Sequence, residues 1–283
     1  MRNLALVPTR SRSTVPRRAA RSDTSGSHAA TSRARDDNAS RVFRELRELI
    51  VWGQLPPGAR ITERTVADRL GVSRTPVRSA LHRLQRDGFI TTAGNGAEQR
   101  LIVAPMTRED GEELYLMVGH LEGFAARLAA MRPVAERKEL VASLRSVNRE
   151  LETALRVLRE LSRVFDLDLE FHRLFVEAVA GPRTLALHRA IKPQIERYAR
   201  AYIGVLLGEL PNSLSEHEAI IRAIQKGDAK AAQLATEMNW QHAAERLLSV
   251  IGQYGERGSW HASAAPESGQ IRQAAHGKSR GRR

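Results

Sequence analysis

The sequence predicts a mainly α-helical protein of two domains, with a small β-hairpin near the end of the first domain. The chain has 283 residues, and one hydrophobic core rarely serves more than roughly 200 residues before the chain divides. Apolar residues recur every three or four positions over most of residues 41–255, which is typical of helices that bury one side. Residues 89–103 depart from that spacing and predict the hairpin.

The composition excludes several classes of protein. The chain has no cysteine, so it can form neither a disulfide framework nor a thiolate metal site, and a reducing cytoplasm suits it. Its apolar runs, of which residues 201–207 are an example, are far shorter than the roughly 20 residues that a membrane helix needs. We therefore expect a cytoplasmic protein that does not span a membrane.

The positive charge is unevenly distributed. The net charge is +13, of which residues 1–40 carry +5, residues 41–104 carry +5 and residues 256–283 carry +4, while residues 105–255 carry −1. A basic module beside a nearly neutral one is the pattern expected when one domain binds phosphate groups. Basic tails alone are more often simply solvated, so the charge supports nucleic-acid binding without proving it.

The two ends of the chain are expected to lack regular structure. Residues 1–40 are rich in Ser, Thr, Arg and Ala and show no apolar periodicity, so ordering them would cost more entropy than their burial could offset. The composition of residues 256–283 is similar. We interpret these segments as a disordered basic arm and tail, which flank a first domain at 41–104 and a second at 105–255.

The first domain contains three predicted helices. One runs from about residue 41 to the Trp52-Gly53 pair. The second is capped by Thr62 and ended by Gly71, and the third is capped by Ser73 and ends near Gly88. Two runs at 89–92 and 101–103 then bracket a polar, glycine-containing segment, as a two-stranded wing would. This order of elements is that of a winged helix-turn-helix, in which the start of the third helix meets base edges in DNA.

The second domain reads as an antiparallel bundle of helices. Six are expected, at about 107–131, 134–157, 159–180, 183–207, 213–226 and 228–252. Gly181-Pro182, 208–211 and Gly227-Asp228 separate the later ones.

A resemblance to the GntR family of repressors runs through the first domain. It is carried by Gly53, Leu55, Pro57 and Gly58, by residues 63–70 and 71–78, and by Ala80, Leu81, Arg83 and Leu84. The resemblance implies that operator bases and phosphates are contacted by Arg64, Arg74, Thr75 and Arg78, and that Gly94 or Gly96 tips the wing in the minor groove. Ser79 departs from the family, which usually has Glu there, and residues 95–99 are not the usual wing.

One constellation in the second domain has the spacing of a metal site. Asp168 and His172 are four residues apart and project from the same side of one helix, and His217 lies on a later helix that a bundle could bring toward them. Imidazole and carboxylate ligands together suit zinc, nickel, manganese or iron. By spacing alone, such residues are more often surface or core side chains than metal ligands.

Residues 110–250 resemble the FCD sensor domain of the FadR subfamily. The resemblance is carried by Leu114-Tyr115, Leu121-Glu122, Ala129-Ala130, the Asp168 and His172 pair, Glu216-His217, Ala223-Ile224 and Gly227-Asp228. It implies a divalent metal held by one Asp and three His, with open positions for an organic-acid effector, and Asp168, His172 and His217 match the first three ligands.

The fourth ligand position departs from this pattern, because Asn239 stands where the family has His. An amide oxygen binds metal more weakly than imidazole, so three alternatives are open. Asn239 binds with reduced affinity, His242 one turn away replaces it, or the pocket takes its effector without metal. Val118 also departs from the Arg that these domains often have, and His120 is the nearby basic-capable side chain expected in the effector pocket.

We therefore expect a homodimeric transcription regulator that acts as a repressor rather than an activator, binds a palindromic operator in double-stranded DNA and responds to a small carboxylate effector. One alternative is a metal-dependent hydrolase or lyase that uses Asp168, His172 and His217. No G-x-S-x-G or H-E-x-x-H motif supports it. Another alternative, an architectural DNA-binding protein, explains the basic tails but gives the polar residues of the bundle no role.

Overall fold

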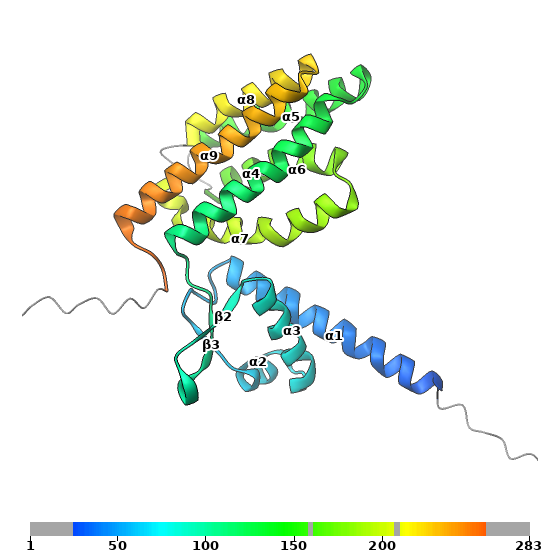
Figure 1. The fold of residues 1–283 in the computed structure, drawn as a ribbon, viewed down its shortest axis with the longest axis vertical. Coiled ribbons are helices and arrows are strands. Elements are labelled where there is room, and N and C mark those ends of the chain that lie inside the picture. The colour runs from blue at the N-terminus through cyan, green and yellow to red at the C-terminus, as the bar shows by residue number, and fades with distance from the viewer. Residues whose placement is uncertain (1–24, 158–160, 207–209, 259–283) are drawn as a thin grey trace, which may run out of the picture.

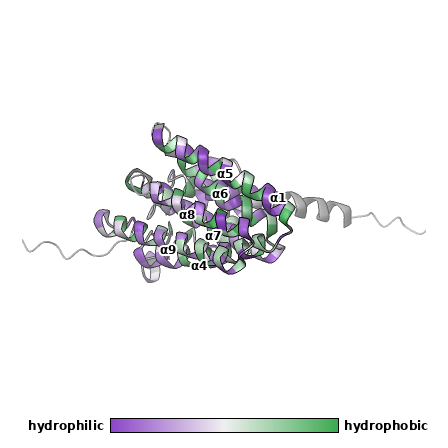
Figure 2. Cartoon of the chain, turned by 90° about the horizontal axis from the view of Figure 1, so that it is seen from above, coloured by the Kyte–Doolittle hydropathy of each residue, from purple (hydrophilic) through white to green (hydrophobic). Residues whose placement is uncertain are grey.

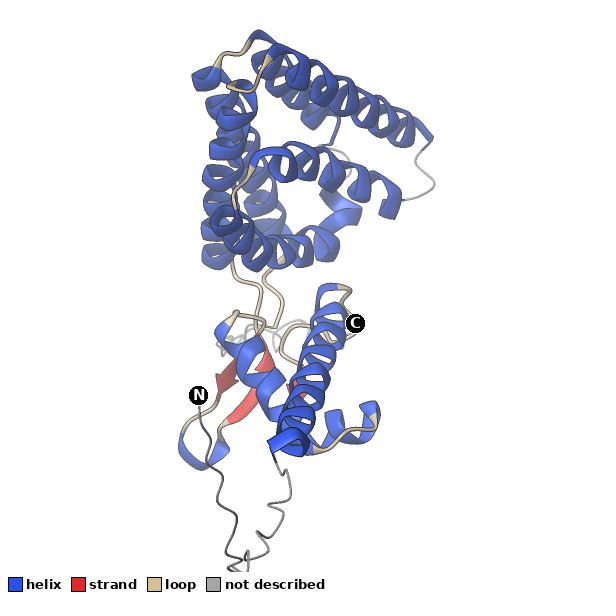
Figure 3. Ribbon diagram, turned by 90° about the vertical axis from the view of Figure 1, so that its right-hand side faces the viewer, coloured by secondary structure: helices blue, strands red, loops and turns tan. Residues whose placement is uncertain are grey.

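The computed structural model describes residues 25–157, 161–206 and 210–258. Its first domain has three helices and a three-stranded sheet, and it lies below the helical bundle (Figure 1, Figure 3). Its elements are α1 Ser25–Val51, β1 Arg60–Ile61, α2 Glu63–Leu70, α3 Arg74–Arg86, β2 Ile90–Ala93, a 3-10 turn at Gly96–Glu98 and β3 Arg100–Val103.

Helix α1 corrects the expected start of the first domain. It begins at Ser25 rather than near residue 41, so the expectation that residues 25–40 lack regular structure is wrong. The packed end of α1 buries Val42, Phe43, Leu46 and Ile50. Once that part is helical, adding residues to it is far easier than nucleating a new helix, and residues 25–40 contain no proline that would stop it. Residues 1–24 of the expected arm lie outside the described residues.

The sheet contains one strand more than the two expected. The strand order is β1-β3-β2, with β2 and β3 paired so that Ile90 lies opposite Val103 and Ala93 opposite Arg100. Strand β1 adds Arg60 opposite Ile102. A strand of two residues carries no alternating pattern long enough to read from sequence, which is why β1 was not expected.

The predicted ends of α2 are confirmed, whereas the predicted start of α3 is only partly so. Thr62 accepts a hydrogen bond from the Thr65 amide at 3.1 Å, and Gly71 ends α2 in the left-handed conformation with φ 63°, which glycine adopts without a steric cost. Ser73 precedes α3 but its side chain makes no capping hydrogen bond.

The bundle has the six helices that the sequence predicts. They are α4 Arg108–Ala130, α5 Val134–Val157, α6 Leu161–Val179, α7 Pro182–Leu206, α8 Leu210–Lys226 and α9 Ala229–Tyr254. Helices α4 and α9 lie side by side (Figure 1) and approach closely because Gly119 has no side chain: a Cβ there would lie 2.9 Å from the Cβ of Trp240. Seen from above, the bundle helices carry both hydrophobic and hydrophilic residues (Figure 2), as one-sided burial requires.

The segment after α9 returns to the start of the bundle. Met106 and Arg257 exchange backbone hydrogen bonds, with N to O distances of 2.8 and 3.2 Å. Residues 256–258 are therefore structured, which corrects the expected start of the disordered tail, while residues 259–283 lie outside the described part of the chain. In the described ranges, no helix has the length and apolar character needed to cross a membrane.

Candidate functional site

The exposed side of α3 presents the polar residues expected to meet DNA. Arg74, Thr75 and Arg78 are exposed, while Val77, Ala80, Leu81 and Leu84 of the same helix are buried in the domain core. In α2, the Arg64 side chain is 80% exposed, with its Nε 3.7 Å from Asp68 Oδ2. Since these helices need one side for packing, the other side is free for a ligand.

Arg78 is held in place by Glu63 at the start of α2. Its Nε donates to Glu63 Oε1 at 2.7 Å and its Nη2 donates to Glu63 Oε2 at 3.0 Å. Such paired hydrogen bonds fix the plane of the guanidinium, and the hydrogen bond from Arg78 lowers the pKa of the Glu63 carboxyl. The sequence analysis did not identify Glu63 as a contact of Arg78.

Two glycines shape the turn between β2 and β3. Gly94 has φ 86°, and a Cβ there would lie 2.7 Å from the Glu98 carbonyl oxygen, so only glycine fits without a shift. Gly96 has φ 55° but open space around it. Gly94 is thus required by the fold of the turn itself, and both glycines lie at the tip of the wing.

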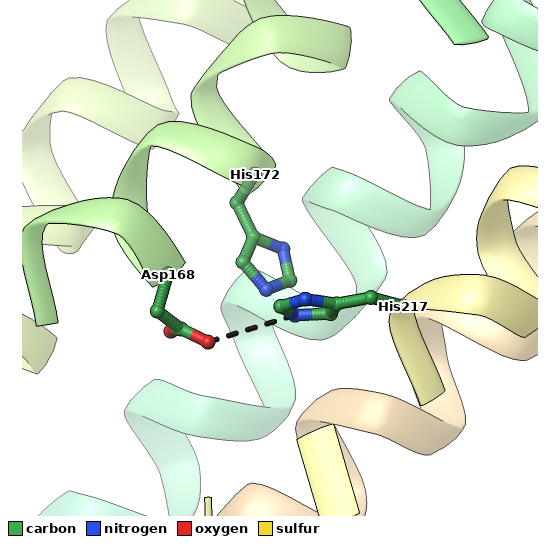
Figure 4. A group of neighbouring side chains, drawn as sticks. All are labelled: Asp168, His172 and His217. Carbon is green, nitrogen blue, oxygen red and sulfur yellow. Dashed lines mark ion pairs between the residues drawn. The ribbon is translucent and has the colours of Figure 1, made fainter. Parts of the chain in front are cut away.

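Three of the four expected metal ligands come together inside the bundle. Asp168 and His172 extend from α6 and His217 extends from α8 (Figure 4). One ligand atom from each lies within 4.8 Å of the others, and His217 Nε2 is 3.5 Å from Asp168 Oδ1. Helix pairing across the bundle therefore brings together residues that are 45 or more positions apart in sequence.

The chemistry of these three residues fits a divalent metal. His172 and His217 are buried, and His217 Nε2 makes no hydrogen bond with any described residue. Burial lowers the pKa of the His217 imidazole well below its ordinary value, which leaves the ring neutral, the form that binds metal. Burial also raises the pKa of the Asp168 carboxyl. An unpaired imidazole nitrogen is costly in a bundle core and is the atom that a metal would satisfy.

The residues considered for the fourth ligand position face Glu216 instead. Asn239 donates to Glu216 Oε2 at 2.7 Å, and His242 Nδ1 lies 2.9 Å from Glu216 Oε1. The guanidinium of Arg246 contacts the same carboxylate. His242, one of the three alternatives for this position, is not among the clustered ligand atoms and pairs with Glu216. Asn239 nevertheless lies near the cluster, since it lines the same cavity as Asp168.

That cavity, of about 80 Å³, lies next to the cluster. Its walls are mostly apolar, with a few polar side chains among them, which is the usual character of a small-molecule pocket. Its lining residues are Tyr115, Phe165, Asp168, Leu169, Ile195, Ala199, Leu206, Ser213, Asn239, Trp240, Ala243 and Arg246. The expected position of His120 in this pocket is wrong: its side chain is 74% exposed and contacts Glu237 at 3.2 Å, because α4 turns that side away from the core.

Two residues that the sequence analysis did not select stand directly behind the histidines. His172 Nδ1 lies 2.7 Å from Glu122 Oε2, and His217 Nδ1 lies 3.1 Å from Asn148 Oδ1. Glu122 appeared in the sequence analysis only as part of a family motif, and no local pattern marked Asn148. Glu122 and Asn148 are far from the histidines in sequence, so only the tertiary structure reveals these contacts.

Helix α7 joins the bundle to the first domain. Gln194 Nε2 donates to the Asp87 carbonyl at 2.7 Å, at the end of α3. The Arg197 guanidinium donates to the Ala104 carbonyl, directly after β3. Helix α7 therefore contacts the first domain both at the end of α3 and directly after β3.

Arg200 of α7 extends this junction toward the cavity. Its guanidinium carbon lies 3.7 Å from the centre of the Trp52 ring, at the end of α1, and 4.7 Å from that of Phe165. Phe165 lines the cavity, as do Ile195 and Ala199 of α7 itself. One helix therefore touches both the cavity and the first domain.

Two stretches of the chain match known protein families. Residues 38–97 match the bacterial regulatory proteins of the gntR family, and residues 113–242 match the FCD domain. The Nta operon transcriptional regulator of Aminobacter aminovorans is 31% identical over 195 residues, which cover 69% of this chain and 87% of that protein. The chain belongs to the GntR family.

This GntR-family transcriptional regulator also has relatives and structural neighbours of the same architecture. The probable D-xylose utilization operon transcriptional repressor of Paenarthrobacter nicotinovorans is 28% identical over 205 residues, covering 69% of this chain and 83% of that protein. The solved structure titled E. coli McbR/YncC has a TM-score of 0.58 and 19% identity, covering 77% of this chain and 99% of that one. The solved structure of a putative GntR transcriptional regulator from Rhodococcus sp. RHA1 has a TM-score of 0.58 and 22% identity, covering 75% of this chain and 98% of that one. The predicted fold class is confirmed.

Proposed function

We propose that this protein is a dimeric repressor that binds a palindromic operator and is released by a small carboxylate effector. The observation that carries the proposal is a single helix, α7, which lines the bundle cavity with Ile195 and Ala199 and holds the first domain through Gln194 and Arg197. An effector in the cavity would therefore contact a helix that also contacts the first domain, and a shift of that helix would move the DNA-reading helices. The names of relatives that are operon repressors support repression as the direction.

Operator binding would use the exposed side of α3 and the wing. Arg74 and Arg78 have the planar donors that suit guanine edges, and Thr75 and Arg64 would add contacts to bases or phosphates. Gly94 and Gly96 would allow the wing tip to approach the minor groove closely. A two-fold dimer would present two such surfaces to half-sites roughly one helical turn apart.

Effector binding would use the cavity and a divalent ion at the Asp168, His172 and His217 cluster. A bound divalent ion supplies a Lewis acid that an effector carboxylate can coordinate. The three residues would hold it through one carboxylate and two neutral imidazoles, which is a donor set for zinc, nickel, manganese or iron. The apolar walls formed by Phe165, Leu169 and Ile195 favour an effector with a hydrocarbon part.

The decisive experiment maps the DNA that the full chain protects. Genomic fragments bound by the purified protein would be footprinted, beginning with the region upstream of its own gene. We expect a protected palindrome, with protection lost when the correct organic acid is added. Protection without sequence preference would overturn the proposal in favour of an architectural role.

A thermal-shift screen then tests whether effector binding depends on a bound metal. Candidate organic acids are added with and without a chelator, because a ligand that binds the folded state raises the unfolding temperature. We expect an acid that stabilises the protein only when metal is present. Turnover of any of these acids by the metal-loaded protein would instead support a hydrolase or lyase that uses the same three residues.

A further inference from the structure

The two histidines of the cluster present the same ring nitrogen to their neighbours in the bundle. In each, Nδ1 faces a polar side chain from another helix, Glu122 of α4 for His172 and Asn148 of α5 for His217. The other ring nitrogen of His172 is directed toward Asp168 and His217 (Figure 4), and His217 Nε2 faces Asp168. The proton on each ring therefore decides whether Nε2 has a free lone pair.

In its ionised form, Glu122 accepts hydrogen bonds and cannot donate them. The surrounding residues keep it ionised. It is fully buried, and the buried ammonium of Lys192, which lies 3.0 Å from Oε1, balances the charge of the ionised carboxylate. Lys192 Nζ donates to Oε1 at 3.0 Å, and Trp240 Nε1 donates to Oε2 at 2.8 Å. His172 Nδ1 lies 2.7 Å from Oε2 but makes no well-aligned hydrogen bond with any described residue. Two atoms this close repel each other unless one carries a proton, and the ionised carboxylate has none, so the proton belongs on Nδ1.

Asn148 has its amide orientation set by a second contact. Its Nδ2 donates to the Leu214 carbonyl at 3.3 Å, which directs its Oδ1 toward His217 at 3.1 Å. An amide oxygen only accepts hydrogen bonds, so His217 Nδ1 must be the donor. The proton on this ring is thereby placed on the side away from Asp168.

We propose that Glu122 and Asn148 are positioning residues that set both histidines in the Nδ1–H form, so that both Nε2 lone pairs face Asp168 as metal ligands. The proposal rests on the metal site of the proposed function. Donation from a ligand histidine to a carboxylate or carbonyl behind it fixes the ring and raises its basicity, and loss of such a partner typically weakens metal binding by roughly 10- to 100-fold.

The first test needs no metal. Ring nitrogens of the apo protein, labelled with ¹⁵N, would be observed by long-range ¹H–¹⁵N NMR, with His172 and His217 assigned through single substitutions. We expect both rings in the Nδ1–H form. In Asn148→Ala, His217 should populate both tautomers while His172 stays unchanged, and Asn148→Asp, which keeps an acceptor, should restore His217. An Nε2–H ring at either position in the wild-type protein overturns the proposal.

The second test measures Zn²⁺ and Ni²⁺ affinity of the full chain by competition with a chromophoric chelator. We expect binding to weaken by roughly 10- to 100-fold in Asn148→Ala and in Glu122→Gln, with affinity regained in Asn148→Asp. Glu196→Gln is the control, because Glu196 is a half-buried glutamate on α7 that is not part of the cluster. Unchanged affinity in Asn148→Ala overturns the proposal.

One outcome keeps this proposal separate from the proposed function. If the wild-type protein binds neither ion while both rings are in the Nδ1–H form, the metal site of the proposed function fails and the positioning role of Glu122 and Asn148 stands on the tautomers. Glu122→Gln could fail to fold, because Lys192 would lose its buried partner. Asn148 is only half-buried, so its variants decide the question in that case.

Discussion

Arg78 of the recognition helix donates two hydrogen bonds to the Glu63 carboxylate, at 2.7 and 3.0 Å. This pair holds the exposed guanidinium in one plane and places a negative charge beside it. Glu63 would therefore have two effects. It would orient Arg78 toward one base of the operator, and its charge would repel the phosphates of DNA that lacks the operator sequence.

The variant Glu63→Gln tests this relationship. Loss of the charge removes phosphate repulsion and frees Arg78, so we expect affinity for random duplex DNA to rise and the ratio of operator to random affinity to fall. The measurement is a pair of binding titrations at several salt concentrations. Equal weakening on both DNAs would contradict the prediction. Asp68→Asn is the control, because it removes an acidic charge beside Arg64 without touching Arg78.

Arg74 is expected to read a base rather than a phosphate. Its exposed position at the start of α3 is the one that reaches base edges in this fold. We expect Arg74→Ala to cost roughly 1 to 3 kcal/mol and to relax specificity at one base pair. Binding would be measured on operators with single substitutions. A uniform loss over all sequences, with a smaller salt dependence, would mark a phosphate contact instead.

Arg200 is expected to carry the effector signal from the cavity to the first domain. Its stacking on Trp52 and contact with Phe165 link the cavity wall to α1. In Arg200→Ala, the effector should still raise the unfolding temperature, but the ratio of operator affinities without and with effector, roughly 5 to 150 for coupled sites, should fall toward 1.

Arg189→Ala provides the matched control for that uncoupling, because Arg189 is an exposed arginine on the same helix. It should leave the ratio at the wild-type value. If Arg200→Ala keeps a normal ratio, the signal does not pass through Trp52, and Gln194→Ala would be examined for the alternative contact with Asp87.

Glu196 on α7 should make stability depend on pH. Burial raises the pKa of its carboxyl, with partial opposition from Lys192 and Arg200. The folded state thus loses stability as pH rises from about 4.5, the ordinary pKa of glutamate, through the raised folded pKa. We expect Glu196→Gln to raise the unfolding temperature at pH 7, with the gain fading toward pH 4. Glu139→Gln, at an exposed position, should show no such trend.

Gly119 should be essential for the close packing of α4 on α9. A Cβ there would lie 2.9 Å from the Trp240 Cβ, so Gly119→Ala must separate the helices and should cost roughly 1 to 3 kcal/mol in unfolding free energy. Gly204→Ala is the control on α7, because nothing lies within 4 Å of its added Cβ. That change should be neutral or stabilising, since alanine favours helix more than glycine. Urea unfolding of both variants would measure the difference.

Most element boundaries could be predicted from the sequence because their causes are local. The cap at Thr62 and the left-handed residue Gly71 act within a few positions, and apolar periodicity marks each bundle helix. Long-range pairing overrode local reading in two places, at the contact of β1 with β3 and at the bridge between Met106 and Arg257. The extension of α1 to Ser25 instead follows from propagation of a helix that is packed at its other end.

For the candidate site, the sequence by itself determined the residue types and their helical spacing, and these together with the resemblance to the FCD domain selected Asp168, His172 and His217. Only the tertiary structure decided the directions of side chains, because these depend on which side each helix buries. It turned His120 to the surface and His242 toward Glu216. It also placed Asn148 against His217 across 69 residues, a contact produced by packing helices from distant parts of the chain, which no local pattern encodes.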